Sequence, residues 1–436
     1  MIDVNALADR ALGIAQKVAG PGVEVRIDTH RTAAANVRFA RNGITTSGSS
    51  DEISVGIWTK IGLRHAHTTT NQSDDASLKA LAERAITMTK LSPEDPESMP
   101  LLPAQKYAAA PPAFDDAVAT MDAPARAQVA LRACTAAEKQ KVWIAGLFER
   151  AAATRALRTS SGISGAHRWT NEAYSTTART QDGTGSGWGA REAWRASELD
   201  DAAVPRVAIE KAVASATPKP LAPGKYTVIL EPAAVQEMLA FMVGAMDQRS
   251  ADEGRSFFSG KVGEKLFPDH VTLKSDPTSP DTPHATFDYE GFALSPHTWI
   301  EAGRVKELEM SRYWAQKQGK QPTGDHSVYA LAGGNAASID ELVRTTKRGL
   351  LVTRFWYTRM LEPQSIMLTG LTRDGVFLIE DGKVTQPVQN FRYNESPITV
   401  LKNSDAMTRE TVRRWGWRIP AIRTNEFTMA SVSAAV

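Results

Sequence analysis

The C-terminal half of the chain opens with Pro223-Gly224-Lys225-Tyr226-Thr227-Val228-Ile229-Leu230-Glu231-Pro232. The β-branched and aromatic run of residues 226–230 predicts a strand. The apolar stretch from Ala233 to Met246 predicts a helix directly after it. Most of the remaining sequence consists of short strand-like segments separated by Gly and Pro. Residues 222–436 are therefore expected to form a β-rich domain.

Two proline-rich linkers divide the chain before this domain. The first covers residues 93–112 and the second covers residues 217–224, where prolines interrupt any regular element. The linkers predict an N-terminal domain over residues 1–92 and a central region over residues 113–216, each with helices and strands. The whole chain is therefore predicted to belong to the α+β class, with a mixed N-terminal half and a β-rich C-terminal domain.

Capping and turn residues predict the local structure of the first two regions. Asp3 is expected to cap the first helix and Ser77 the second. Arg41-Asn42-Gly43-Ile44 predicts a tight hairpin, because Asn-Gly supplies the positive φ angles of a type I′ turn. In the central region, helices are expected near 123–140 and 201–216, and strands near 142–150, 154–160 and 168–180.

Composition excludes several classes of protein. Hydrophobic residues make up 42% of the chain, and 51 basic against 49 acidic residues leave a formal charge of +2. Such a chain can bury a core and has no general affinity for polyanions. Cys134 is the only cysteine, which excludes an intramolecular disulfide and a thiolate-rich metal cluster. Without a basic, apolar leader or an apolar run of about 20 residues, a soluble cytoplasmic protein is expected.

Several short segments follow one another in an order and spacing that a known family shares. After the opening strand come Gly254-Arg255-Ser256-Phe257-Phe258, Phe287-Asp288-Tyr289-Glu290-Gly291, Pro322-Thr323-Gly324-Asp325-His326, Thr369-Gly370, Glu380-Asp381-Gly382-Lys383 and Asn390-Phe391-Arg392. Residues 38–43 and 182–188 match in the N-terminal half. On these segments the chain resembles the TldD/PmbA peptidases, also labelled modulators of DNA gyrase, over nearly its whole length. The resemblance implies a β-rich C-terminal domain of the TldD/PmbA type.

Active members of that family carry a His-Glu-x-x-x-His helix, in which the histidines bind zinc and the glutamate acts as general base on the zinc-bound water. The resemblance places this motif at Ala240-Phe241-Met242-Val243-Gly244-Ala245. Ala240 and Ala245 then stand at the ligand positions, and Phe241 stands at the base. The family's C-terminal cysteine ligand is missing too, since no cysteine follows Cys134. The chain thus resembles the PmbA (TldE) branch, which lacks the metal site, so neither a catalytic residue nor a cofactor is expected in it.

A helix freed from metal binding must still fill the same space. Met238, Leu239, Phe241, Met242 and Met246 are therefore expected to pack inside.

The resemblance leaves two classes of function open. In the first, the chain is a non-catalytic subunit that pairs with a zinc-bearing TldD-type paralogue, and the heterodimeric metallopeptidase degrades unfolded peptides in the cytoplasm. Zinc is then expected in the partner subunit. In the second, the chain is a stand-alone homodimer that binds peptides or another ligand without hydrolysis. A hydrolase built on another constellation has less support, since no Gly-x-Ser-x-Gly elbow is present. Neither a membrane nor a nucleic acid is expected as a partner.

One strand-like segment is a candidate for binding the peptide. Residues 351–359 alternate so that Arg354, Trp356 and Thr358 share one face. An exposed strand of this kind can bind an extended peptide through main-chain hydrogen bonds, whereas core packing of its aromatic residues is the other interpretation. Further candidate peptide contacts, from segments around the lost zinc site, are Arg255, Ser256 and Thr323.

The histidines give weaker signals. His65 and His67 are two residues apart and so share a strand face, from which they could bind a metal ion. A third ligand is not evident, and a surface or inter-domain histidine pair is the plainer interpretation. His284, His297 and His326 have no metal-binding spacing and are expected to be structural.

Three other features are also ambiguous. Gly183-Thr184-Gly185-Ser186-Gly187 lacks the Gly-Lys-Ser/Thr ending of a phosphate-binding loop and predicts a Gly-rich turn or bulge. Cys134 lies in an alanine-rich helix and is expected to be a buried thiol. Arg413-Arg414-Trp415-Gly416-Trp417-Arg418 could stack on single-stranded nucleic acid, but a packed strand with cation–π contacts is the interpretation we favour.

Overall fold

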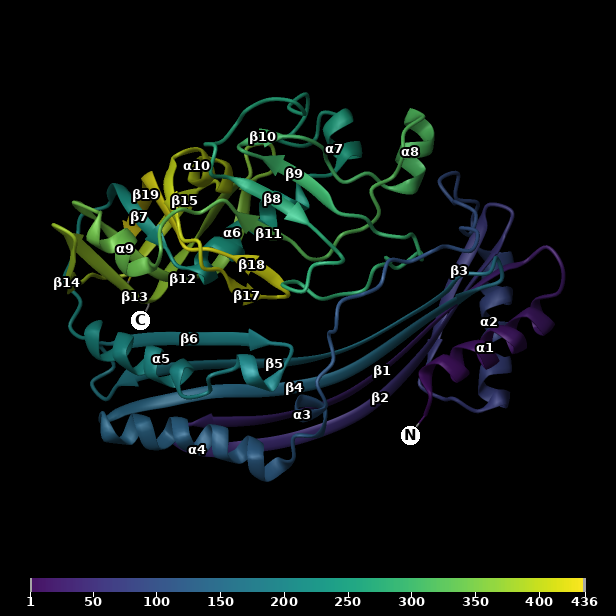
Figure 1. Ribbon diagram of the computed structural model, residues 1–436, viewed down its shortest axis with the longest axis horizontal. Helices are drawn as coiled ribbons and strands as arrows, with labels where there is room; N and C mark the ends of the chain where they lie inside the picture. The colour runs from purple at the N-terminus through teal and green to yellow at the C-terminus, as the bar shows by residue number, and fades with distance from the viewer. Residues whose placement is uncertain (1, 434–436) are drawn as a thin grey trace.

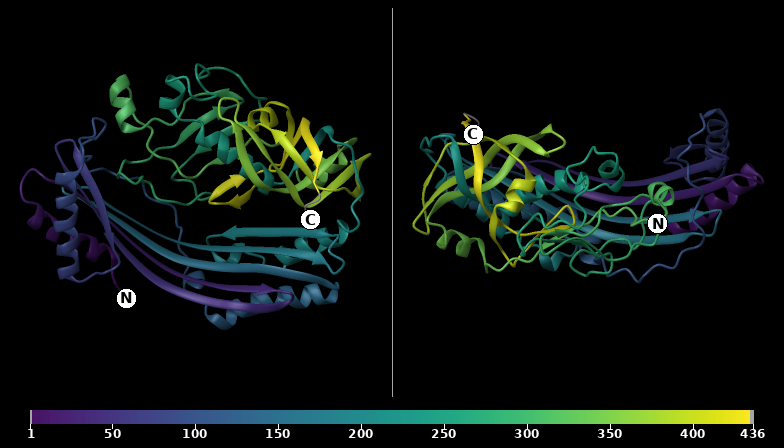
Figure 2. Two further views of the ribbon diagram at one scale, coloured as in Figure 1. Left: turned by 180° about the vertical axis from the view of Figure 1, so that it is seen from behind. Right: turned by 90° about the horizontal axis from the view of Figure 1, so that it is seen from above.

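The computed structural model describes residues 2–433, which form a long curved sheet with a second, more compact half above it (Figure 1). Figure 2 shows the sheet extending beyond the C-terminal half at the end that carries the N-terminus. Helices and strands both contribute, and the second half is rich in strands, so the predicted α+β class is confirmed. The last three residues of the predicted C-terminal domain, 434–436, lie outside the described part. Among residues 2–433, no helix is long and apolar enough to cross a membrane.

The long sheet is antiparallel throughout, in the order β3-β2-β1-β4-β5-β6. Its strands are β1 (Glu24–Ala40), β2 (Gly43–Ile61), β3 (Arg64–Thr70), β4 (Val142–Thr159), β5 (Ser164–Thr180) and β6 (Ser186–Ala193). Because β1 pairs with β4, one sheet runs through the predicted regions 1–92 and 113–216. The prediction of separate strands at 142–150 and 154–160 was wrong, since β4 pairs with both neighbours without interruption between them.

Helices cover the two ends of this sheet and bury two separate apolar clusters. At one end lie α1 (Val4–Ala19) and α2 (Asp75–Leu91), and at the other lie α4 (Ala123–Lys139) and α5 (Ala203–Ala214), with the short α3 (Asp116–Thr120) and a 3-10 turn (Ala196–Glu198) beside them. Asp3 caps α1 as predicted. The cap of α2 is Asp74, not Ser77, whose backbone N–H donates to the Asp74 carboxylate. The earlier start adds one turn of helix.

The β1–β2 hairpin is tight, but its turn is displaced by one residue from the prediction. The positive φ angles belong to Arg41 (48°) and Asn42 (62°), while Gly43 already pairs with Ala40. The Asn42 side chain accounts for the shift, because it donates to the carbonyl of Val142 (3.0 Å) and accepts from the N–H of Ile144 (2.8 Å). Asn42 thereby joins the hairpin to the start of β4.

The glycines expected to form a turn or bulge instead let α5 approach β6. Only Gly183 lies in the turn, with a φ of 75°. Gly185, Gly187 and Gly189 alternate along β6, and a Cβ on any of them would overlap the main chain of α5. Since alternate residues of a strand share one face, these glycines form a flat surface for the helix. The alternate spacing of these glycines therefore allows α5 to pack closely against β6.

The C-terminal half contains two sheets. In the first, β7 (Gly224–Leu230), β19 (Ile422–Val432), β15 (Phe391–Glu395), β13 (Met367–Glu380) and β12 (Arg348–Glu362) pair in a closed circuit, because β12 also pairs with β7. Two further strands extend it, β14 (Lys383–Pro387) and β16 (Ser404–Met407). The second sheet has the order β10 (Arg304–Val305), β9 (His297–Glu301), β8 (Thr272–Ser275), β11 (Ala330–Ala332), β18 (Trp417–Ile419) and β17 (Val412–Arg414).

Helix α6 (Pro232–Gly244) lies in the middle of this half, while the shorter helices α7 (Gln248–Asp252), α8 (Arg312–Gln318), α9 (Ile339–Arg344) and α10 (Pro397–Lys402) lie around it (Figure 1). As expected, Met238, Leu239, Met242 and Met246 are buried in the common core. Phe241 departs from the expectation, since it is only half-buried. It faces a hollow beside the helix.

Histidines lie where the two halves meet. His167 on β5 is close enough to His284 of the C-terminal half for their charges to interact. His326 is buried, with its ring 5.1 Å from that of His297 and 5.4 Å from that of Trp299. Burial lowers the pKa of His167 and of His326 to about 4, and neighbouring histidines act in the same direction. Both rings are therefore neutral in the folded protein near neutral pH.

Replacing Gly187 by Ala is expected to destabilise the protein by about 2–3 kcal/mol or more, because the new methyl group overlaps the main chain of α5. Urea unfolding measures the loss. Gly13→Ala is the matched control, since no heavy atom lies within 4 Å of the added methyl, and it is expected to stabilise α1 by about 0.5–1 kcal/mol. Equal effects of the two changes would contradict the close approach of α5.

Acid is expected to weaken the fold through His326. The pKa of His326 is lowered from 6.5 to about 4 on folding, so between these pH values the unfolded chain binds a proton at this ring and the folded chain does not. The free energy of unfolding therefore falls as the pH drops from 6.5 toward 4. Between pH 7 and pH 5 the unmodified protein should lose about 1–2 kcal/mol more than the His326→Gln variant. Unfolding midpoints at both pH values test this, and identical losses would contradict it.

Candidate functional site

Helix α6 carries the positions at which the resemblance places the zinc motif. Ala240 and Phe241 lie in its last turns, and Ala245 is its C-cap. All three line hollows, so a bound molecule could reach them. Their side chains hold no nitrogen, oxygen or sulfur atom, so this site does not fit a zinc ion. Among residues 2–433, no three His, Cys, Asp or Glu side chains are arranged to hold a metal ion.

The α6–β12 pocket is a hollow of about 590 Å³ between α6, β12, β6 and the β17–β18 turn. It brings together three predicted peptide contacts and two of the motif positions. Its lining consists of Trp188, Ala233, Gln236, Glu237, Ala240, Phe241, Arg354, Phe355, Trp356, Tyr357, Thr358, Arg359, Arg414 and Trp415. Residues far apart in the sequence therefore share one site, and the pocket lies where β6 meets the C-terminal half.

Arg354 is held in this pocket by a buried carboxylate. Its Nε donates to Asp374 (2.6 Å), whose side chain has no exposed surface. The other oxygen of Asp374 accepts from the hydroxyl of Ser186 on β6 (2.5 Å). The guanidinium also lies 5.0 Å from the ring centre of Trp188 and 5.5 Å from that of Trp356. Asp374 thus neutralises Arg354 and ties it to the long sheet.

The expected alternation of Arg354, Trp356 and Thr358 fails at its last member. Trp356 is exposed, but Thr358 is buried and bonds to Glu237 (2.5 Å) and to the hydroxyl of Tyr393 (2.9 Å). The cause is a bulge between Trp356 and Arg359, in which Tyr357 adopts a φ of 60°. A bulge inserts a residue and so turns the following side chains to the opposite face. Thr358 therefore faces the core, and Trp356 and Tyr357 remain at the pocket rim.

The Arg413–Arg418 segment forms the β17–β18 hairpin. Its two-residue turn consists of Trp415 (φ 50°) and Gly416 (φ 80°), and the preceding Arg414 pairs with Trp417. Arg414 lies 5.2 Å from the ring centre of Trp188. The favoured interpretation, a packed strand with a cation–π contact, describes this geometry.

Trp415 and Tyr357 are both bulky residues with positive φ, and both line the α6–β12 pocket. Backbone conformations of this kind are costly for large side chains and cluster at ligand-binding sites.

A smaller hollow of about 340 Å³ continues from Ala240 and Phe241 past the end of α6 and reaches Arg255 and Ser256. Ser256 has a structural role, because its hydroxyl donates to the carbonyl of Ala245 (2.6 Å) and accepts from the N–H of Phe258 (3.1 Å). Arg255 is paired with Glu253 but remains exposed. Of the two, Arg255 is the better placed for a peptide.

Thr323 lies away from both hollows. It is buried, and its hydroxyl accepts from the N–H of Met310 (2.9 Å) and donates to the carbonyl of Gly324 (3.0 Å). Its hydroxyl is thus already occupied within the loop.

His65 and His67 share one face of β3, but each has a different neighbourhood. His65 bonds to Asp95 (3.0 Å), whereas His67 lines a small hollow with Arg26, Asp28 and His30. Burial lowers the pKa of His67. The prediction of an inter-domain or surface pair fits this placement better than a shared ligand set.

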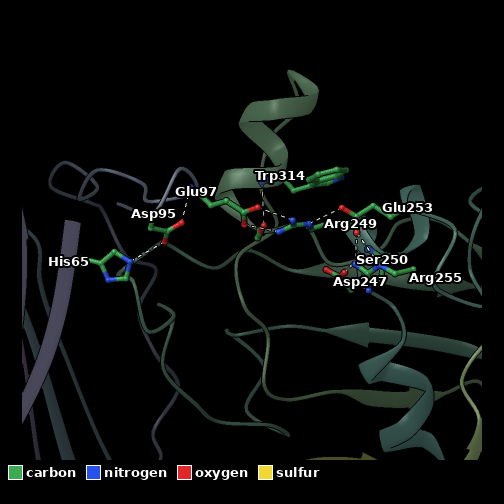
Figure 3. A network of polar contacts seen from close by, with 10 residues as sticks. His65, Asp95, Glu97, Asp247, Arg249, Ser250, Glu253, Arg255 and Trp314 are labelled. Carbon is green, nitrogen blue, oxygen red and sulfur yellow. Dashed lines mark hydrogen bonds and ion pairs between the residues drawn. The ribbon is translucent and has the colours of Figure 1, made fainter. Parts of the chain in front are cut away.

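A second cavity, of about 600 Å³, lies between the far end of the sheet and the C-terminal half. The linker of residues 93–112 forms one wall, and Figure 3 shows how it is held. Arg249 on α7 donates to both carboxylate oxygens of Glu97 (2.7 and 2.8 Å) and also to Glu253 (3.1 Å). The indole of Trp314 donates to Asp252 (2.7 Å). Arg249 on this wall therefore already has carboxylate partners.

Nine of the fourteen lining residues of the α6–β12 pocket were not predicted as contacts or motif positions, and Glu237, Arg414 and Trp188 are among them. Glu237 lies one turn before Phe241 and therefore shares its helix face, so the predicted motif position could have pointed to it. Trp188 and Arg414 lie far from α6 and β12 in the sequence, so only the fold reveals that they line this pocket. Cys134 is buried in α4, and burial raises the pKa of its thiol, which keeps it in the unreactive protonated form.

Comparisons with known proteins match most of the chain. The family model described as "PmbA/TldA metallopeptidase C-terminal domain" covers residues 223–431, and "PmbA/TldA metallopeptidase domain 1" covers residues 25–89. A protein named "Metalloprotease" from Methanothermobacter thermautotrophicus is 24% identical over 212 residues, which are 45% of this chain and 46% of that protein. Another "Metalloprotease", from Archaeoglobus fulgidus, is 27% identical over 158 residues, 35% of this chain and 33% of that one. The matches thus span less than half the length of these relatives.

Two solved structures have the same fold over their whole length. TldE from Thermococcus kodakarensis is 18% identical, with a TM-score of 0.86 that covers 98% of this chain and 100% of that one. A putative modulator of a DNA gyrase from Thermotoga maritima is 17% identical, with a TM-score of 0.83 over 97% and 99% of the two chains. The predicted fold, with its β-rich C-terminal domain, is confirmed.

Asp374→Asn is expected to destabilise the protein by about 2–4 kcal/mol, because it removes the buried charge that compensates half-buried Arg354, while asparagine tolerates the φ of 58° at this position. Asp381→Asn is the matched control, since Asp381 also has a positive φ (46°) but is exposed, and its change should stay within about 0.5 kcal/mol. Thermal unfolding of both variants tests the difference, and equally small losses would contradict the role of Asp374.

Proposed function

This chain belongs to the PmbA/TldD family, and on that premise we propose that it is the zinc-less, peptide-binding subunit of a two-subunit TldD/TldE-type metallopeptidase. The complex would process unfolded peptides in the cytoplasm. Zinc bound by the partner would supply the activated water for hydrolysis, and this chain would hold the peptide.

The chemistry of α6 carries the proposal. The helix is present, and its motif positions line hollows, but Ala240, Phe241 and Ala245 offer neither a metal ligand nor a base. Peptide hydrolysis in this family requires both a bound zinc ion and a general base. A chain that keeps the hollow without these groups is suited to bind a peptide and not to cleave it.

The free edge of β12 supports peptide binding. One edge of β12 pairs with β13 along most of its length, whereas β7 pairs with the other edge only from Leu350 to Val352. Beyond Val352, no described strand pairs with that edge, and the α6–β12 pocket lies beside it. An extended peptide could therefore add to the sheet through main-chain hydrogen bonds, with side chains against Trp356 and Tyr357.

Exposed apolar side chains support a partner subunit. The last part of β12 presents Trp356, Tyr357, Met360 and Leu361 to solvent. Apolar groups gathered in this way are typical of protein interaction sites. The same feature suits the second candidate, a homodimer that binds peptides without cleaving them, so an assay has to separate the two.

The test is hydrolysis of an unstructured peptide by this chain alone, by a TldD-type subunit of the same organism alone, and by both together. We expect no cleavage by this chain, and chelator-sensitive cleavage that is strongest with both. Trp356→Ala should raise the KM of the two-subunit enzyme several-fold, because apolar contact area between the indole ring and the peptide is lost. Trp143→Ala is the matched control, since both tryptophans are 44% exposed and Trp143 lies on the long sheet.

Chelator-sensitive cleavage by this chain alone, or about one tightly bound zinc per chain by elemental analysis, would overturn the proposal. Equal cleavage by the partner with and without this chain would leave the homodimeric binding protein as the function.

A further inference from the structure

We propose that Arg414 binds a carboxylate group of the peptide in the α6–β12 pocket, so that the pocket selects peptides with a free C-terminus or an acidic side chain. This inference rests on the proposed peptide-binding function and adds the chemical class of the preferred peptide. Its basis is that the three arginines of the pocket differ in how their charges are satisfied.

Arg354 and Arg359 do not need a ligand. Arg354 is paired with the fully buried carboxylate of Asp374. Arg359 is exposed to solvent, with its guanidinium 4.3 Å from the ring centre of Tyr357. Water can therefore solvate Arg359, and Asp374 neutralises Arg354.

Arg414 has no such compensation. Its Nε is buried without a hydrogen-bond acceptor among the described residues, and its guanidinium forms no ion pair with them. Its contact is the ring of Trp188, 5.2 Å away. Burial lowers its pKa, and the carboxylates that face it, Glu192 and Glu237, act only at a distance, alongside Arg354 and Arg191. A buried charged donor without an acceptor is costly, so this position is satisfied when an anion enters the pocket.

The local backbone holds Arg414 in place before a ligand arrives. It is the last residue of β17 and pairs with Trp417 across the two-residue turn. Trp417 is buried, and its indole N–H donates to the carbonyl of Ser327 (2.8 Å). Its ring also packs against Tyr329, with the ring centres 4.8 Å apart. A guanidinium on a fixed hairpin can bind a carboxylate with little loss of entropy.

The charge of the pocket suits an anionic group. Its lining contains Arg354, Arg359 and Arg414 but one carboxylate, Glu237. Asp374, which pairs with Arg354, and Glu192, which acts on Arg414 from a distance, lie outside the lining. Arginine and carboxylate also match in geometry, since two parallel N–H···O bonds can form.

Three versions of one fluorescein-labelled, unstructured decapeptide test the inference with the full-length protein. The first has a free C-terminal carboxylate and no acidic side chain, the second has a C-terminal amide, and the third has the amide and one internal Glu. Fluorescence polarisation should show that the first, the third or both bind about tenfold more tightly than the second. The peptide that gains affinity identifies the source of the carboxylate.

Arg414→Gln should abolish this preference, and Arg414→Lys should restore part of it. Arg413→Gln is the matched control, because Arg413 is the adjacent half-buried arginine with unpartnered nitrogens but does not line the pocket, and the preference should persist. Equal binding of the three peptides to the unmodified protein would overturn the inference and leave peptide binding intact. Binding of none of them would overturn the proposed function as well.

Discussion

The buried carboxylate of Asp374 holds the α6–β12 pocket together, because it bonds to Arg354 on β12 and to Ser186 on β6. A second contact acts beside it, in which Lys211 of α5 donates to the carboxylate of Glu231, the residue that precedes α6 (2.6 Å). Both contacts cross from the long sheet to the C-terminal half. They require α5 to lie close to β6, which the alternating glycines of β6 permit. The Asp374 contact, the Lys211–Glu231 contact and the close approach of α5 to β6 together place Trp188 of β6 in the pocket.

The end of α6 shows that a fold places a surface beside a hollow without fixing the chemistry of that surface. The helix retains its place in the common core through Met238 and Met242, so its last turns still face the hollows. The residues that α6 itself contributes at its end, Ala240, Phe241 and Ala245, are apolar, and Ser256 caps the carbonyl of Ala245. Function therefore depends on the side chains at the wall and not on the fold that presents them.

The α6–β12 pocket and the cavity beside the linker differ in charge. The cavity beside the linker contains several carboxylates, and burial together with the charge of Asp325 raises the pKa of Glu309 there. Two of its arginines fix the linker, because Arg249 pairs with Glu97 and Arg312 donates to the carbonyl of Pro100. In the α6–β12 pocket the arginines outnumber the carboxylates, and one of them lacks a partner. An extended chain between the two halves would thus meet surfaces of opposite sign.

Residue identity and order alone determined the family, the α+β class, the Asp3 cap and the apolar identity of Ala240 and Phe241 on α6, because each of these depends on local patterns. The tertiary structure decided that one sheet continues from β1 into β4, that a bulge turns Thr358 inward, and that Thr323 lies away from the other candidate contacts. The tertiary structure also decided that Asp374 neutralises Arg354, whereas Arg414 has no ion pair among the described residues. Ser186 and Asp374 are 188 residues apart, and contacts at such separation leave no periodic signal in the sequence. A single inserted residue in a strand likewise reverses every later side chain, and only the paired neighbour reveals it.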